Sequence, residues 1–161
     1  MDFRQDLSGP SIEASHSSED VRWPTQSRRE RGASRQRGIL PGALSAGSIE
    51  GISAACAYDS DVTALNETST EVAVGWQAVL DSWKAVPFES FAELSCVMTN
   101  PAIKVHGTIA RVAGLERVRG KTKNGESFAF TALGTNVFEK RGDRWLIVHH
   151  HASKAAEQLT I

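Results

Sequence analysis

A meander of three long strands dominates the second half of the chain and constrains the fold more than any other feature. Alternating apolar and polar residues run over 108–121, 126–140 and 144–153. The Asn-Gly pair at 124–125 joins the first two segments and favours a tight hairpin, because both residues tolerate positive φ. A Gly-Asp turn within 141–143 joins the last two. Long strands connected by tight turns pair as antiparallel neighbours, so the sequence predicts an antiparallel sheet.

Two helices and several shorter strands precede this meander. Apolar residues recur at helical spacing within 43–58, where the Ser48 hydroxyl can cap a first turn. A second amphipathic helix is predicted over 76–86 and ends before Pro87. Short strands are expected over 62–66, 70–74, 91–98 and 102–107, the last two separated by a turn or bulge at Asn100-Pro101. Together these elements predict an α+β fold with helices on one face of a strongly curved sheet.

The first 40 residues differ in composition from the rest of the chain. They hold seven arginines and six carboxylates, and six of the arginines fall within 22–37. Such a segment cannot bury enough apolar surface to offset the entropy of ordering, so residues 1–40 are predicted to be disordered. Two alternatives remain open: a basic arm for nucleic acid or acidic lipid, and sequence that lies upstream of the native start.

Composition argues against several broad classes of protein. The 161 residues carry a net charge of -1, which argues against a protein that binds the nucleic-acid backbone, and the length fits one domain. The sequence has no run of about 18 apolar residues and no secretory signal at its start, so neither a membrane span nor export is expected. Cys56 and Cys96 match no metal or disulfide framework, which favours the cytoplasm. The glycines form no phosphate-binding loop, and no cofactor is predicted.

The last predicted hairpin carries a recognisable set of residues. The matching positions are Thr135, Phe138, Gly142, Arg144, Trp145, Ile147, Val148, His149, His151 and Ser153. With this ending the chain resembles the nuclear-transport-factor-2-like domains, specifically their SnoaL-like branch, within the ketosteroid-isomerase-like superfamily. Asp59, Asp61 and Gly75 extend the resemblance toward the N-terminus, so that it covers about residues 43–153.

This resemblance implies a cone-like, strongly curved antiparallel sheet with helices packed on its concave face and a ligand pocket between the two layers. It implies a SnoaL-like domain over 41–154 and a C-terminal tail over 155–161. The family begins with a full amphipathic helix, of which only the last turn, at Ala43 and Leu44, is expected here. A homodimer formed through the sheet is the family's usual arrangement, and apolar residues on both faces of 126–140 agree with it.

His149 and His151 are the leading candidates for catalysis. Strand alternation places them on one face and His150 on the other, and the resemblance implies that the face of His149 and His151 points into the cone. A histidine there can act as a general acid or base near neutral pH. The alternatives are a structural role for both imidazoles, or a metal bound together with Asp61 or His106, although the sequence spacing supports no metal site.

Tyr58 and Asp61 form a second candidate pair. A ketosteroid-isomerase-type reaction needs a carboxylate base beside a carbonyl group and an acidic donor that stabilises the enolate. Asp61 can serve as the base and Tyr58 as the donor, although aspartate is equally common in the turn between a helix and a strand. Arg111 and Glu116 fall on opposite faces of a regular strand, so they are not expected to form a joint site.

Four further residues are candidates for contact with a ligand. Trp83 lies on the helix face that opposes the sheet, and Phe130 shares its strand face with two other phenylalanines. Asn66 and Thr135 are polar residues on otherwise apolar strands, where they can orient a ligand or simply occupy an edge.

These residues predict a small-molecule pocket protein. The leading hypothesis is a cofactor-free isomerase, cyclase or hydratase that acts by acid–base chemistry on an apolar carbonyl compound. The alternative is a non-catalytic ligand-binding or oligomerisation module, as resemblance to the association domain of calmodulin-dependent kinase allows. The expected partners are a small apolar ligand and a second copy of the chain, with neither nucleic acid nor membrane.

Overall fold

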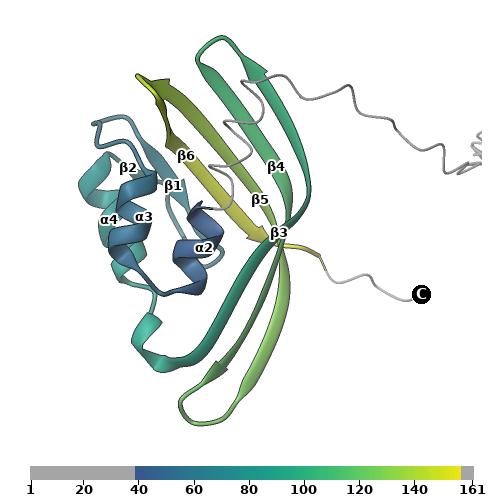
Figure 1. Cartoon of the computed structure of the whole chain (residues 1–161). Coiled ribbons are helices and arrows are strands. Elements are labelled where there is room, and N and C mark those ends of the chain that lie inside the picture. Colours follow the sequence, from purple (N-terminus) through teal and green to yellow (C-terminus); the bar gives the residue numbers. More distant parts are fainter. Residues whose placement is uncertain (1–38, 157–161) are drawn as a thin grey trace, which may run out of the picture.

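The computed structural model describes residues 39–156, which form a layer of helices packed against a curved sheet (Figure 1). The predictions for residues 1–38 and 157–161, including most of the segment expected to be disordered, lie outside the described residues. The elements in chain order are α2 (Ile39–Ser45), α3 (Ile49–Ala55), β1 (Thr63–Leu65), β2 (Ala73–Val74), α4 (Trp76–Lys84), the 3-10 helix η1 (Phe88–Ser90), β3 (Phe91–His106), β4 (Ile109–Thr122), β5 (Ser127–Arg141) and β6 (Arg144–Lys154).

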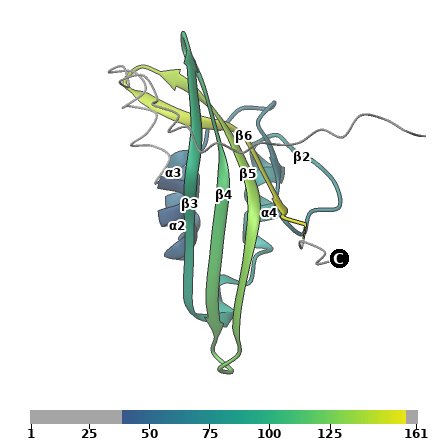
Figure 2. The same cartoon turned by 90° about the vertical axis from the view of Figure 1, so that its right-hand side faces the viewer.

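The described strands form one six-stranded sheet in the order β2-β1-β6-β5-β4-β3. Strands β4 to β6 are the predicted antiparallel meander, β3 adds a fourth antiparallel strand beside β4, and the helices lie against the concave face. Figure 2 views the sheet from its convex side, with the helices behind it. The α+β fold with helices on a curved sheet is therefore confirmed. In addition to these antiparallel pairs, β1 runs parallel to β6, so the sheet as a whole is mixed.

Several local sequence signals have the predicted effect. The Ser48 hydroxyl accepts a hydrogen bond from the Gly51 amide over 3.0 Å and caps α3. Gly75 precedes α4 with φ 83°, a left-handed conformation that favours glycine. Asn100 adopts φ 48° beside Pro101, and the pairing of β3 with β4 shifts there. The predicted bulge is confirmed, and the two strands expected around it form one bent strand.

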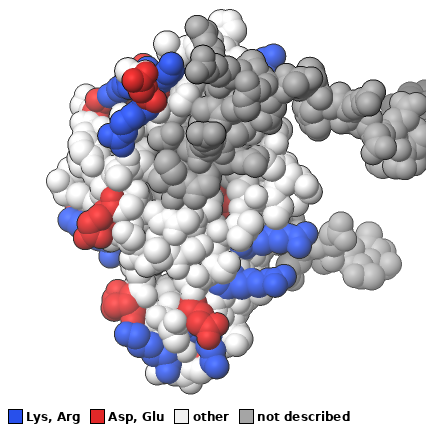
Figure 3. Space-filling model, viewed as in Figure 1, with Lys and Arg blue, Asp and Glu red and all other residues white. Residues whose placement is uncertain are grey.

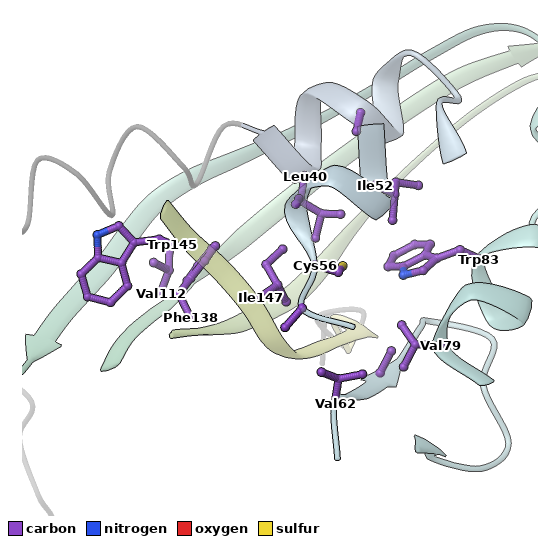
Figure 4. Close-up of a cluster of buried hydrophobic side chains, with 14 of the residues drawn as sticks. Leu40, Ile52, Cys56, Val62, Val79, Trp83, Val112, Phe138, Trp145 and Ile147 are labelled. Carbon is purple, nitrogen blue, oxygen red and sulfur yellow. The ribbon is translucent and has the colours of Figure 1, made fainter. Parts of the chain in front are cut away.

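The hydrophobic core lies between the helices and the sheet (Figure 4). Leu40, Ile52, Val112 and Phe138 are fully buried in it. Leu40 belongs to the segment predicted to be disordered, yet it packs into the core from α2, so the domain boundary predicted after residue 40 falls inside a helix. α2 is also longer than the single turn expected at this point.

Candidate functional site

A cavity of about 120 Å³ lies between α4 and the concave face of the sheet. Its wall is mainly apolar, and the aromatic side chains on it are Trp83, Phe88, Phe91, Phe128 and Phe130. The ionisable side chains on the wall are Glu67, Cys96, Glu116 and His150. Two of the four ligand-binding residues predicted from the sequence, Trp83 and Phe130, are therefore brought together here. An apolar interior with a few polar groups is the usual composition of a small-molecule site.

A bulge in β6 decides which histidine faces this cavity. Val137 of β5 pairs with His149 and Phe138 pairs with Ile147, so Val148 is an extra residue in β6. The alternation of β6 shifts by one residue beyond it. The orientation predicted for His149 and His151 is therefore wrong: both lie on the convex side, and His150 lines the cavity.

His150 is held in a fixed position inside the protein. Its side chain is 3% exposed, and its Nδ1 lies 2.8 Å from Oδ1 of Asn136 on β5. Because the Asn136 oxygen accepts, Nδ1 carries the hydrogen and Nε2 is left as an acceptor. Burial lowers the pKa of His150 to about 3, with smaller effects from His149 and His151. His150 is therefore a neutral imidazole at physiological pH.

Glu116 is the second ionisable group that the fold brings to the cavity. Its side chain is 2% exposed, and among residues 39–156 it forms neither a side-chain hydrogen bond nor an ion pair. A Cβ at Gly134 of the neighbouring strand would come within 2.4 Å of Glu116 Oε1, so the missing side chain of Gly134 makes room for the carboxyl group. Burial raises the pKa of Glu116 to about 7, and the charge of Glu67 adds to this effect.

Sequence reasoning missed Glu116 as a site residue although a signal was present. The inward face of β4 reads Ala110, Val112, Gly114, Glu116 and Val118, a row of small or apolar residues with one carboxyl group. Charged side chains are almost never fully buried without a partner unless they have a specific role. From the sequence, Glu116 was compared only with Arg111, to ask whether the two share a strand face. It was not compared with the apolar residues on its own face.

The second predicted pair does not reach the cavity. Tyr58 is 61% exposed and its ring stacks on Trp76 with centroids 4.4 Å apart. Asp61 is exposed in the turn before β1. The neighbouring Asp59 forms an ion pair with Arg141 on the rim of the sheet. The structure therefore assembles no carboxylate and phenol around a shared ligand position here.

The remaining two predicted ligand contacts also lie away from the cavity wall. Asn66 is buried, and its amide donates a long hydrogen bond of 3.5 Å to the Ser82 hydroxyl. Its Oδ1 has no partner among the described residues. Thr135 pairs with His151 on the convex side of the sheet.

Within residues 39–156, no group of three histidine, cysteine or carboxylate side chains is arranged to hold a metal ion. In the same part of the chain, no helix has the length and apolar character needed to cross a membrane.

The fold of this chain is found in many solved structures. An NTF2-like superfamily protein from Salmonella enterica matches with a TM-score of 0.71 and 16% identity, covering 81% of this chain and 94% of that one. A ketosteroid isomerase-like protein from Erwinia carotovora matches with a TM-score of 0.67 and 13% identity, covering 82% and 100%. The CamKII hub homology domain from Chlamydomonas reinhardtii matches with a TM-score of 0.63 and 22% identity, covering 78% and 98%. At these identities the likeness shows the fold alone.

Among curated proteins, none matches the sequence significantly. The family of SnoaL-like domains matches residues 41–157, which is most of the chain and includes all of β1 to β6. The geometry agrees with this match, since the curved sheet, the helices on its concave face and the cavity between them are all present. The chain therefore belongs to the SnoaL-like domain family.

Proposed function

We propose that this chain binds a small apolar carbonyl compound in its cavity and acts on it by acid–base chemistry, as a cofactor-free isomerase, cyclase or hydratase. The observation that carries this proposal is Glu116, a buried carboxyl group without a partner among residues 39–156, on the wall of an apolar cavity. Buried ionisable groups with shifted pKa values in a cavity are candidates for catalysis.

Glu116 is suited to carry a proton in both directions. A catalytic group works best when its pKa lies near the working pH, and the pKa of Glu116 is about 7. The ionised carboxylate would take a proton from the carbon next to the carbonyl: the C–H bond breaks, an O–H bond forms on Glu116, and the electron pair moves to the carbonyl oxygen. When a C=C bond adjoins the carbon that lost the proton, the electron pair flows back from the oxygen, the carbonyl re-forms, and the C=C bond moves as its far carbon takes the proton back from Glu116, which completes an isomerisation. His150 Nε2, a neutral acceptor, would receive a hydrogen bond from a ligand hydroxyl group.

The size of the cavity limits the ligand. A dry protein cavity of about 150 Å³ is known to hold benzene. The cavity here has a volume of about 120 Å³, so the part of the ligand that it encloses is about as large as one six-membered ring. Larger ligands would require side chains on the wall to move.

Exchange of hydrogen for deuterium tests this proposal without knowledge of the natural substrate. A cyclic ketone such as cyclohexanone is incubated with the protein in D₂O, and loss of its α-proton signal is followed by NMR. We expect the protein to accelerate exchange and Glu116→Gln to abolish the acceleration. The matched control is Glu126→Gln, in the exposed turn between β4 and β5. Equal exchange rates with and without the Glu116 carboxyl group would contradict a catalytic role for it.

The alternative function, an oligomerisation module, is supported by the convex face of the sheet. Val97, Ile109 and Leu133 are 51%, 42% and 52% exposed, and they come from three neighbouring strands. We propose that a second copy of the chain covers this face. Light scattering of the whole chain should show a dimer at micromolar concentration, and Leu133→Lys should shift it toward the monomer. A monomer in the unsubstituted protein would contradict the dimer while leaving the cavity unaffected.

A further inference from the structure

We propose that the ligand of the cavity carries a positively charged nitrogen, so that the natural substrate class is a small apolar amine that also bears the reactive carbonyl group. This inference rests on the proposed function, because it concerns the compound that the same cavity binds. It follows from the charges and ring faces that the wall presents.

The wall presents negative groups without a positive one. Glu67 enters the wall from the loop after β1 and Glu116 from β4, and among the described residues that line the cavity there is neither lysine nor arginine. The imidazole of His150 supplies no charge, because burial lowers its pKa to about 3. A bound carboxylate or phosphate would therefore meet two carboxyl groups, whereas Lys154, the cation over the Phe130 ring, is not among the residues that line the cavity. Burying an unpaired charge is costly.

The two carboxyl groups already disfavour each other. Burial is the main cause of the raised pKa of Glu116, and the charge of Glu67 adds to it. Burial likewise raises the pKa of Cys96 on β3 to about 12, with smaller effects from both carboxylates. These groups and His150 are the ionisable side chains among the described residues that line the cavity, and the exposed Lys154 lies near them over the Phe130 ring. An ammonium group would relieve this repulsion and would favour the ionised form of Glu116. The negative groups on the wall thus favour a cationic ligand over an anionic one.

The aromatic part of the wall suits the same ligand. Ring faces attract cations through the negative charge density above the ring, and the attraction is greater where water is excluded. Phe128 lies between Phe91 and Phe130, with ring centroids 5.3 and 6.4 Å apart. The protein itself shows this contact at the same cluster, since Lys154 Nζ lies 5.5 Å from the centroid of the Phe130 ring. Aromatic faces and carboxylates together recognise organic ammonium ions.

Three probes of nearly equal shape test the charge preference: benzylamine, benzyl alcohol and benzoate. Their dissociation constants are measured by calorimetry at pH 8, where Glu116 is mostly ionised and the amine is protonated. We expect benzylamine to bind at least tenfold more tightly than benzyl alcohol, about 1.4 kcal/mol, and benzoate to bind more weakly than both. Equal or tighter binding of benzyl alcohol would overturn the cationic ligand while leaving the pocket proposal intact. Absence of binding by all three would overturn both.

A variant identifies the source of the preference. Glu67→Gln should reduce the ratio of benzylamine to benzyl alcohol affinity about fivefold or more. The control is Glu71→Gln in the same loop, because Glu71 is exposed and does not line the cavity. An unchanged ratio in Glu67→Gln would contradict the role of Glu67 in cation binding.

The pH dependence of benzylamine affinity provides a second test, because this affinity would not depend on the ionisation of Glu116 if that residue had only a structural role. Benzylamine should bind more tightly as pH rises through about 7, because Glu116 then becomes ionised. Benzyl alcohol should show no such gain, and Glu116→Gln should remove the gain for benzylamine. Parallel pH profiles for the charged and the neutral probe would overturn the proposal.

Discussion

His150 and its two neighbours in β6 are chemically identical side chains in different environments. His150 is buried on the concave side, bonded to Asn136, and its ring lies 5.1 Å from that of Trp83. His149 is half-buried on the convex side, where its Nδ1 lies 2.7 Å from the Thr63 hydroxyl oxygen. Burial lowers the pKa of His149 as well, but His150 shows the large shift. The difference shows that pairing with β5, rather than residue type, determines what each imidazole can do.

The same contrast extends over the whole sheet. On β4 the inward face carries the buried Glu116, whereas Arg117 and Arg119, on either side of Val118, are exposed on the outward face. Figure 3 shows basic side chains projecting from the convex edge of the molecule. The concave face therefore buries its ionisable groups and shifts their pKa values, whereas the charged side chains of the convex face remain exposed to water.

The largest expected effect comes from removing the inward imidazole. His150→Ala should lower the free energy of unfolding by about 2–4 kcal/mol, because it creates a cavity and leaves the Asn136 carbonyl group buried without its donor. Urea denaturation at pH 7.5 measures this change. A loss below about 1 kcal/mol would mean that the two faces of β6 do not differ in the way described.

Glu116→Gln should alter the pH dependence of stability. The pKa of Glu116 is about 7 in the folded protein against 4.5 for an ordinary glutamate, so the folded state holds this proton more tightly. Its contribution is present below about pH 4.5 and is lost as pH rises to about 7. Glutamine, which stays neutral, should therefore make the variant more stable than the parent at pH 8, by on the order of 3 kcal/mol, with little difference at pH 4.5.

The lowered pKa of His150 changes stability with pH in the opposite direction, and the same experiment can detect this. Its pKa is depressed in the folded state, so the stability that it contributes is present above about pH 6.5 and is lost as pH falls toward about 3. Between pH 4.5 and 6.5 the two groups offset each other in the parent. In Glu116→Gln only the His150 contribution remains, and stability should rise with pH over this interval. Urea denaturation at several pH values measures both curves, and parallel curves for parent and variant would contradict the burial of Glu116 as a titrating group.

Gly134→Ala tests the space in which the carboxyl group lies. The new Cβ would clash with Glu116 Oε1, and the expected cost is about 1–2 kcal/mol because the side chain must find another rotamer. Thermal unfolding measures the change. The same substitution in a Glu116→Ala background should cost distinctly less, because the clashing atoms are absent. An equal loss of stability in both backgrounds would mean that the new Cβ does not clash with the Glu116 side chain.

The smallest effects are expected on the convex side. His149→Ala and His151→Ala should each change the free energy of unfolding by less than about 1 kcal/mol, since both side chains are only partly buried. Urea denaturation beside His150→Ala provides the comparison. Neither substitution should alter ligand affinity in the cavity, and a specific loss of ligand binding in His151→Ala would restore the original assignment of this residue.

The fold was predictable because it rests on short-range periodicity. The alternation of β4, β5 and β6 and the Asn-Gly turn are local signals, and Trp83 and Phe130 followed from the faces of their elements. The parallel pairing of β1 with β6 was not predictable, because it joins segments about 85 residues apart that carry no mark of their direction.

The site was less predictable, because its position depends on a single extra residue. The bulge at Val148 contains neither glycine nor proline, so no residue in the sequence marks it, and simple alternation assigned the wrong histidines to the cavity. Tyr58 and Asp61 were chosen by analogy of residue type, and the turn before β1 carries them away from the cavity. To identify Glu116 from the sequence, one would have to compare all the residues on the inward face of β4.

The run of three histidines has a consequence for how this strand tolerates change. In most strands, a slip of one residue exchanges an inward polar group for an apolar one and destroys a site. If β6 lost its bulge and paired regularly, His149 and His151 would turn inward in place of His150. Both registers thus present an imidazole to the interior. Insertions or slips near Val148 would therefore change the position of the inward imidazole on β6 without removing it.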